Sequence, residues 1–194
     1  EIYPGDWSSD VCSSDLYKRN AVMLKKRNKI IYYITIALFV MYVLFLVWII
    51  LFKLELSLSG LGTIRAYNLI PFHYEDGHNV RFHFSEVINN ILIFIPVGVY
   101  LSLLLKKISH CIKIVFIFGI SLALECSQFI LSVGRFDITD LITNTIGGLF
   151  GIGFYLIGCT LFFDKEKADR YIAVVVNTVT VLLICGTLLL LLLN

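Results

Sequence analysis

Charged residues are scarce in this sequence. They make up 15% of its 194 residues, whereas soluble domains carry about a quarter. Hydrophobic residues make up 58%, and the mean hydropathy is +0.86. A soluble fold of this composition lacks the polar atoms needed to cover its surface, so the composition excludes an ordinary soluble domain. The length allows one compact helical bundle and leaves no room for a second soluble domain.

Recognisable cofactor and metal motifs are also missing. No pair among the five cysteines has the CxxC spacing of a metal or redox site, and each cysteine in the apolar segments is expected to be a small buried hydrophobe. These cysteines are Cys111, Cys126, Cys159 and Cys185. His73, His78 and His83 lack the spacing of metal ligands. We therefore expect no metal, no cofactor and no nucleic-acid partner.

The first residues differ in character from the rest. Residues 1–16 are polar and rich in Ser and Asp, and they lack the basic start, apolar centre and cleavage site of a bacterial signal peptide. We expect residues 1–22 to be a foreign or disordered leader. Met23 is then the natural start, and residues 23–194 form a single membrane domain.

Five apolar segments are long enough to cross a bilayer as helices, which takes roughly 20 residues. A helix satisfies its backbone hydrogen bonds internally, as lipid requires, and these continuous runs do not alternate like the strands of a membrane β-barrel. The sequence therefore predicts an all-α polytopic membrane bundle, with consecutive spans packed as antiparallel neighbours. The predicted spans are residues 30–52, 87–105, 112–131, 141–163 and 171–193.

Lysine and arginine are distributed unevenly between the two sides of the predicted bundle. Twelve of the 16 lie before the first span or in the second and fourth connections. The positive-inside rule places those regions in the cytoplasm. We therefore predict a multi-pass protein of the bacterial plasma membrane, with its N-terminus cytoplasmic and the long loop of residues 53–86 outside.

Polar residues within the second to fourth spans gather in their outer halves, while the inner halves are apolar. Glu125 lies roughly 10 Å below the outer end of its helix, at 1.5 Å per residue. An acid at that depth needs a partner or a water-filled cavity. We predict an outward-open polar cavity, with Arg135 as the counter-charge and Arg65 or Arg81 closing over the top. Its other predicted lining residues are Gln128, Asp137, Asp140 and Asn144.

Several polar residues near this face also have simpler structural interpretations. Glu86 suits the positive end of a helix dipole, and Asn89 and Asn90 can form hydrogen bonds between helices. Asp137 and Asp140 can cap a helix. The small residues Gly147 and Gly151 are expected to allow close helix packing.

These residues resemble the motifs of the VanZ-like family, in the same order along the chain. Residues 89–98 (NNILIFIPVG) resemble that family's Asn–Pro–x–Gly helix, and residues 68–72 (NLIPF) resemble its outer-loop element. Residues 125–128 (ECSQ), 134–140 (GRFDITD) and 144–148 (NTIGG) complete the pattern, which covers about residues 65–155. The resemblance implies a cell-envelope protein. The family's namesake is associated with low-level resistance to the glycopeptide antibiotic teicoplanin, without replacement of the D-Ala-D-Ala target.

Three functions fit these observations. In the first, the chain binds an envelope lipid or a lipid-linked wall precursor at the extracytoplasmic face. If the chain is an enzyme, it also modifies this ligand. Arg135 then binds phosphate, with Glu125, Asp137 and Asp140 as the other candidate catalytic groups. The second function is a small carrier or flippase, and the third is a non-catalytic interaction module in which the polar cluster holds the helices together. Candidate ligand-binding residues are Asn68, Asn89, Asn90, Gln128, Asn144 and Arg65.

Overall fold

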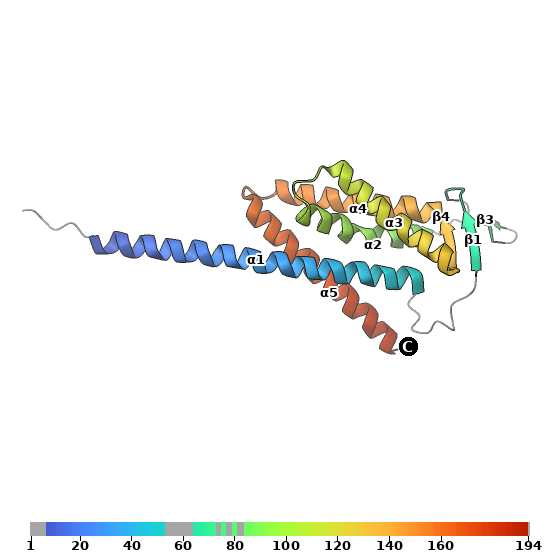
Figure 1. Cartoon of the computed structure of the whole chain (residues 1–194), viewed down its shortest axis with the longest axis horizontal. Coiled ribbons are helices and arrows are strands. Elements are labelled where there is room, and N and C mark those ends of the chain that lie inside the picture. Colours follow the sequence, from blue (N-terminus) through green and yellow to red (C-terminus); the bar gives the residue numbers. More distant parts are fainter. Residues whose placement is uncertain (1–6, 53–63, 73–74, 77–78, 81–83, 194) are drawn as a thin grey trace, which may run out of the picture.

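Five long helices dominate the computed structural model, which describes residues 7–52, 64–72, 75–76, 79–80 and 84–193 (Figure 1). Each helix is long and apolar enough to cross a membrane. This confirms the predicted all-α bundle, and the chain is a multi-pass membrane protein whose helices contact lipid. The helices are α1 (Trp7–Phe52), α2 (Phe84–Leu104), α3 (His110–Leu131), α4 (Ile138–Thr160) and α5 (Lys165–Leu193).

Helix α1 begins well before the first predicted span. It starts at Trp7, so most of residues 1–22 continue the helix that later enters the bundle. Its apolar portion, Lys26–Leu51, is the part that can cross the membrane. The assignment of residues 1–22 to a leader stays a prediction.

Two small sheets lie at one end of the bundle (Figure 1). Strand β1 (Ile64–Asn68) pairs in parallel with β4 (Val133–Asp137), and β2 (Glu75–Asp76) pairs antiparallel with β3 (Asn79–Val80). The sequence did not predict the β1–β4 pair, because two short strands from distant segments carry no joint local pattern. Since α4 begins directly after β4, the pairing attaches the outer loop to the start of α4.

The centre of the bundle is the pair formed by α2 and α4, which run parallel to each other. Consecutive helices also pack against each other, as predicted, most extensively α3 and α4, but glycines let the non-consecutive α2 and α4 approach most closely. A methyl group added to Gly147 would lie 2.2 Å from the carbonyl oxygen of Ile91. One added to Gly151 would lie 2.1 Å from that of Ile95. The two backbones are in direct contact, which confirms the predicted role of these glycines.

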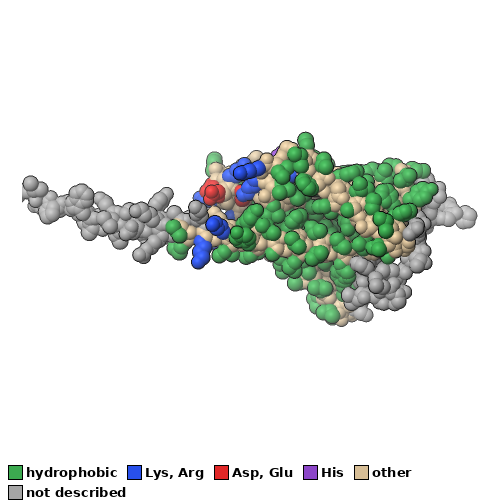
Figure 2. Space-filling model, in the orientation of Figure 1, with side chains coloured by type: hydrophobic (Ala, Val, Ile, Leu, Met, Phe, Trp, Pro, Cys, Tyr) green, Lys and Arg blue, Asp and Glu red, His purple; other side chains and the backbone are tan. Residues whose placement is uncertain are grey.

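Helices α1 and α5 cross each other and complete the bundle (Figure 1). Tyr42 on α1 is buried in the core with Phe94 and Tyr100 of α2, and its hydroxyl donates to the carbonyl oxygen of Ile93 at 2.6 Å. Most of the outer surface in view is hydrophobic, as expected for helices that face lipid (Figure 2). In a bilayer such side chains need no burial inside the protein, so core and surface are both apolar.

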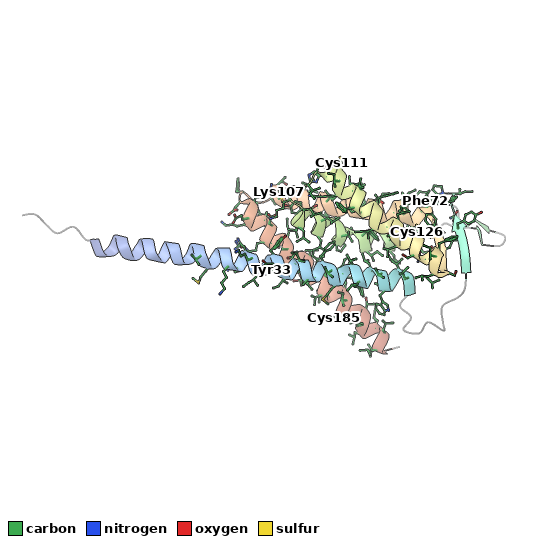
Figure 3. All side chains as sticks on the ribbon, viewed as in Figure 1. Tyr33, Phe72, Lys107, Cys111, Cys126 and Cys185 are labelled. Carbon is green, nitrogen blue, oxygen red and sulfur yellow. The ribbon has the colours of Figure 1, made fainter. Side chains whose placement is uncertain are left out.

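The cysteines illustrate the same point. Cys111 and Cys185 are exposed, so the expectation that they are buried is wrong for these two, while Cys126 and Cys159 are partly buried. All four are free thiols, and Figure 3 shows Cys111, Cys126 and Cys185 far apart. An apolar segment of a membrane protein places small hydrophobes toward lipid as readily as toward the core.

The bundle has two chemically different ends. Charged side chains gather at one end, where α2 finishes and α5 begins (Figure 2). We call this the basic end; Lys107 marks it in Figure 3, and Phe72 marks the opposite end, which carries β1 and β4. We call the opposite end the strand end. The positive-inside rule predicts that the basic end is cytoplasmic and the strand end is outside.

Candidate functional site

Glu125 lies on α3 near the strand end, and only 1% of its surface is exposed. Helix α3 stops at Ser132, whose left-handed backbone (φ 58°) turns the chain back into β4. This reversal brings the backbone N–H of Asp137 to the Glu125 carboxylate, which accepts its hydrogen bond at 2.9 Å. Glu125 is therefore enclosed by protein, and the expectation that it lines an outward-open cavity is wrong.

Asp137 connects three elements through one carboxylate that is almost completely buried. Its Oδ1 accepts from the backbone N–H of Thr139 at 2.8 Å, which makes Asp137 the N-cap of α4, as its spacing had suggested. Its Oδ2 accepts from the Asn68 side chain at 3.1 Å and forms an ion pair with Arg135 at 3.3 Å. One side chain thus holds together the end of β1, the end of β4 and the start of α4.

Asp140 lies in the first turn of α4 and is half-buried. The side chain of Asn90 on α2 donates to its Oδ1 at 2.7 Å, so Asn90 forms the interhelical hydrogen bond expected of it. The negative charges of Asp137 and Glu86 and the positive charge of Arg135 act on this carboxyl group. Asp140 therefore belongs to the same electrostatic cluster as the β4 residues.

Arg135 is the most accessible charged member of the cluster, with 41% of its side chain exposed. It lies on β4 two residues before Asp137, so the two side chains point to the same face of the strand. Its guanidinium forms an ion pair with the Asp137 carboxylate, and the side chain is partly exposed to the surroundings. We refer to Asn68, Asn90, Glu125, Arg135, Asp137 and Asp140 as the strand-end cluster.

Three other predicted site residues lie outside this cluster. Gln128 donates to the carbonyl oxygen of Ile50 on α1 at 2.8 Å, and Asn144 donates deeper in the bundle to Ser121 at 3.0 Å. Asn89 is exposed at the start of α2. Arg65 lies on β1 opposite Gly134, but its side chain, like Arg81 and the three loop histidines, lies outside the described residues.

Thr139 is a member of this region that the sequence analysis missed. It is completely buried, and its hydroxyl accepts from the backbone N–H of Phe72 at 3.0 Å. Phe72 has a left-handed backbone (φ 58°), which ends the NLIPF segment against the start of α4. The loop motif therefore docks onto the helix that carries Asp140, although nothing in the spacing of residues 68–72 indicates this.

A second polar group was also missed, because its members come from three different helices. The hydroxyl of Tyr100 contacts Thr180 at 2.9 Å and Asn177 at 3.1 Å, and Asn177 donates to Thr35 at 3.1 Å. Asn177 and Thr180 are three residues apart on α5, and this spacing places both side chains on one face of the helix. It is the signal in the sequence that could have indicated the group. The prediction that the inner halves of the spans are apolar is therefore wrong at these positions.

The strand-end cluster combines three carboxylates, two amides and one exposed guanidinium. Among the described residues, no group of three or more His, Cys, Asp and Glu side chains has an arrangement that could hold a metal ion. An accessible guanidinium held by a buried carboxylate is suited to binding an oxyanion. The structure thus defines a polytopic membrane protein with a cluster of charged and amide side chains at one membrane face.

Comparison with known proteins gives the family. The VanZ/LLP1 family model matches residues 39–162, and the chain belongs to this family. It is 36% identical over 149 residues to Protein VanZ of Enterococcus faecium, a match that covers 76% of this chain and 88% of that protein. The family match extends beyond residues 65–155 and includes part of α1. No solved structure matches the chain.

Proposed function

We propose that this protein binds the phosphate of an envelope lipid or of a lipid-linked wall precursor at the strand end, on the extracytoplasmic side. The exposed Arg135 guanidinium, 3.3 Å from the buried Asp137 carboxylate, carries the proposal. The planar fork of arginine binds phosphate oxygens in pairs. Arg135 lies at the end of the membrane spans, which is the depth of the phosphate groups of membrane lipids.

The surrounding bonds support this function because they fix the arginine before a ligand arrives. Asp137 is itself held by Asn68 and by the first turn of α4, so its ion pair with Arg135 has little freedom to move. A side chain that is ordered in advance loses less entropy on binding. Glu125 acts one step further away, through the backbone N–H of Asp137, and we assign it a positioning role.

Asp140 is the carboxylate that we assign to any proton exchange with the ligand. It is half-buried, and the hydrogen bond from the Asn90 side chain goes to its Oδ1. A general acid or base must reach the reacting group directly or through one water molecule. Glu125 and Asp137 are enclosed and already accept hydrogen bonds, so neither meets this requirement as well as Asp140.

The similarity to Protein VanZ suggests an effect of this binding that can be measured in living cells. We propose that binding of the envelope component contributes to glycopeptide resistance, here tested with teicoplanin. The informative variants are Arg135→Gln and, as a charge-matched control at the basic end, Arg27→Gln. In a Gram-positive host with matched protein levels, Arg135→Gln should abolish the change in susceptibility that the wild type causes, and Arg27→Gln should keep it.

Direct binding tests the ligand class independently of resistance. Purified protein should retain a polyprenyl phosphate in preference to the polyprenol that lacks the phosphate, and Arg135→Gln should lose this preference. Equal retention of the two lipids by the wild type would overturn the proposed phosphate site. Full preference in Arg135→Gln would show that another group binds the phosphate.

Two substitutions at Glu125 separate a positioning residue from a catalytic acid. Glu125→Gln keeps an oxygen that can accept from the Asp137 N–H, whereas Glu125→Ala removes the acceptor. A positioning role predicts that Gln preserves most activity and Ala does not. Loss of activity in both variants at normal abundance would instead assign Glu125 to the chemistry.

The hydrogen bond from Asp137 to Glu125 also favours a second candidate function, a non-catalytic interaction module. In this case the cluster only joins α3, β4 and α4, and the partner binds elsewhere. Arg135→Gln should then lower the amount of folded protein and leave activity per molecule unchanged. Measuring abundance and lipid retention on the same samples distinguishes this candidate from phosphate binding.

A further inference from the structure

A cavity of about 270 Å³ lies at the basic end, far from the strand-end cluster. Residues of α1, the last turns of α2 and the first turns of α5 line it. Its wall is partly apolar, with Ile31, Leu103 and Ala173, and partly polar. The cavity therefore lies where the hydrocarbon core meets the predicted cytoplasmic headgroup region.

Most of the polar groups around this cavity already have partners. Asp169 accepts a hydrogen bond from the Tyr155 hydroxyl at 2.8 Å through Oδ1, and its Oδ2 pairs with Lys106. Thr35 accepts from the Asn177 side chain. The charges of Asp169 and Lys106 thus compensate each other, and neither determines what the cavity attracts.

Two buried polar atoms in the wall are different. Asn28 Oδ1 and Arg170 Nε are both inaccessible, and neither has a hydrogen-bond partner among the described residues. Buried polar groups are nearly always paired, because an unpaired group has lost its water without a replacement. One of these atoms is an acceptor and the other a donor. A ligand that offers both a donor and an acceptor would therefore satisfy them once the two lining side chains turn toward the cavity.

The remaining charge in the cavity favours a phosphate as the acceptor. Glu166, the other acid in the lining, is exposed, so solvent screens it. Arg170 carries its charge on a guanidinium whose Nε is buried, where an anion interacts more strongly. The ligand's phosphate then faces Arg170, and a hydroxyl or ammonium group faces Asn28.

The size and position of the cavity indicate a lipid headgroup as the source of this phosphate. Ligand pockets for drug-sized molecules span about 300–1,000 Å³, so this cavity suits a headgroup better than a whole lipid. Exposed apolar residues such as Ile34 on α1 and Val174 on α5 lie near it along the same helices and offer a surface for acyl chains. Tyr32, which also lines the cavity, is exposed and of the type enriched at membrane interfaces.

We infer that this cavity binds the headgroup of a cytoplasmic-leaflet phospholipid whose head alcohol can donate a hydrogen bond, as in phosphatidylethanolamine or phosphatidylglycerol. Arg170 holds the phosphodiester and Asn28 accepts from the head alcohol. This site is separate from the proposed extracytoplasmic function, because it lies at the opposite end of the bundle and involves different residues.

The test compares lipids that differ in one property, using native mass spectrometry of the purified full chain. Phosphatidylethanolamine and phosphatidylcholine have the same net charge, but only the former has N–H donors. We expect the wild type to bind phosphatidylethanolamine at least tenfold more tightly than phosphatidylcholine. Soluble glycerophosphoethanolamine should bind far more weakly, and equal binding of this soluble headgroup would overturn the lipid as the source.

Two variants assign the binding to the cavity. Arg170→Gln should lower the affinity for phosphatidylethanolamine at least tenfold, whereas Arg27→Gln, an equal charge change at an exposed position of α1, should not. Asn28→Ala removes the side-chain amide, whose Oδ1 has no partner among the described residues, so it should fold and should abolish the preference over phosphatidylcholine. Wild-type affinity and preference in both Arg170→Gln and Asn28→Ala would overturn the proposal.

Discussion

The contact between α2 and α4 gives a sharp prediction for a single methyl group. In Gly151→Ala the new methyl carbon would lie 2.1 Å from the carbonyl oxygen of Ile95 and 2.9 Å from the Cα of Gly98. Carbon atoms pack at about 3.5–4.0 Å. Both obstacles are backbone atoms, so no side chain can rotate away, and the helices have to separate by roughly 1 Å.

The size of the effect follows from two opposing contributions. Overpacking a tight contact costs about 1–3 kcal/mol, and more where backbone has to move. Replacing glycine by alanine inside a helix returns up to about 1 kcal/mol of helix propensity. We therefore expect Gly151→Ala to destabilise the protein by about 1–2 kcal/mol, and to weaken any function that requires α2 and α4 to hold the strand-end cluster together.

Gly153→Ala is the matched control on the same helix. A methyl group at Gly153 would meet nothing within 4 Å, so only the gain in helix propensity remains and stability should be unchanged or higher. The assay is thermal unfolding of the purified protein in one detergent, with both variants measured beside the wild type. Equal melting temperatures for Gly151→Ala and Gly153→Ala would refute direct backbone contact between α2 and α4.

Two further predictions test contacts that the sequence did not reveal. Tyr100→Phe removes the hydroxyl that contacts Thr180 and Asn177, and it should lower the stability of the protein by about 1 kcal/mol. Tyr33→Phe, at a position 67% exposed, should be neutral in the same thermal assay. Equal effects of the two substitutions would contradict these hydrogen bonds of Tyr100. Cysteines placed at Tyr67 and Phe136, which pair in the β1–β4 register, should cross-link in a background without the native cysteines. Cysteines at Tyr67 and Val133, three positions out of register, serve as the control pair, and cross-linking as efficient in that pair would contradict the register.

The strand-end cluster shows how far local sequence patterns reach. The positions of the spans placed Glu125, Arg135 and Asp140 at one membrane face, because depth follows directly from counting residues along a helix. The hydrogen-bond partners of these residues could not be predicted from the positions of the spans. Glu125 accepts from a backbone N–H rather than lining a cavity, and Asn68 reaches Asp137 only because β1 pairs with β4.

The sequence by itself determined the membrane, the five spans and the face that carries the cluster. Each of these depends on hydropathy, helix length or charge within one continuous segment, so local composition is sufficient. Tertiary structure alone decided that α2 packs on α4, that the outer loop forms a strand beside β4, and that Arg170 and Asn28 share a cavity. Such contacts join residues far apart in the chain, and among uniformly apolar helices hydrophobic periodicity does not specify which faces meet.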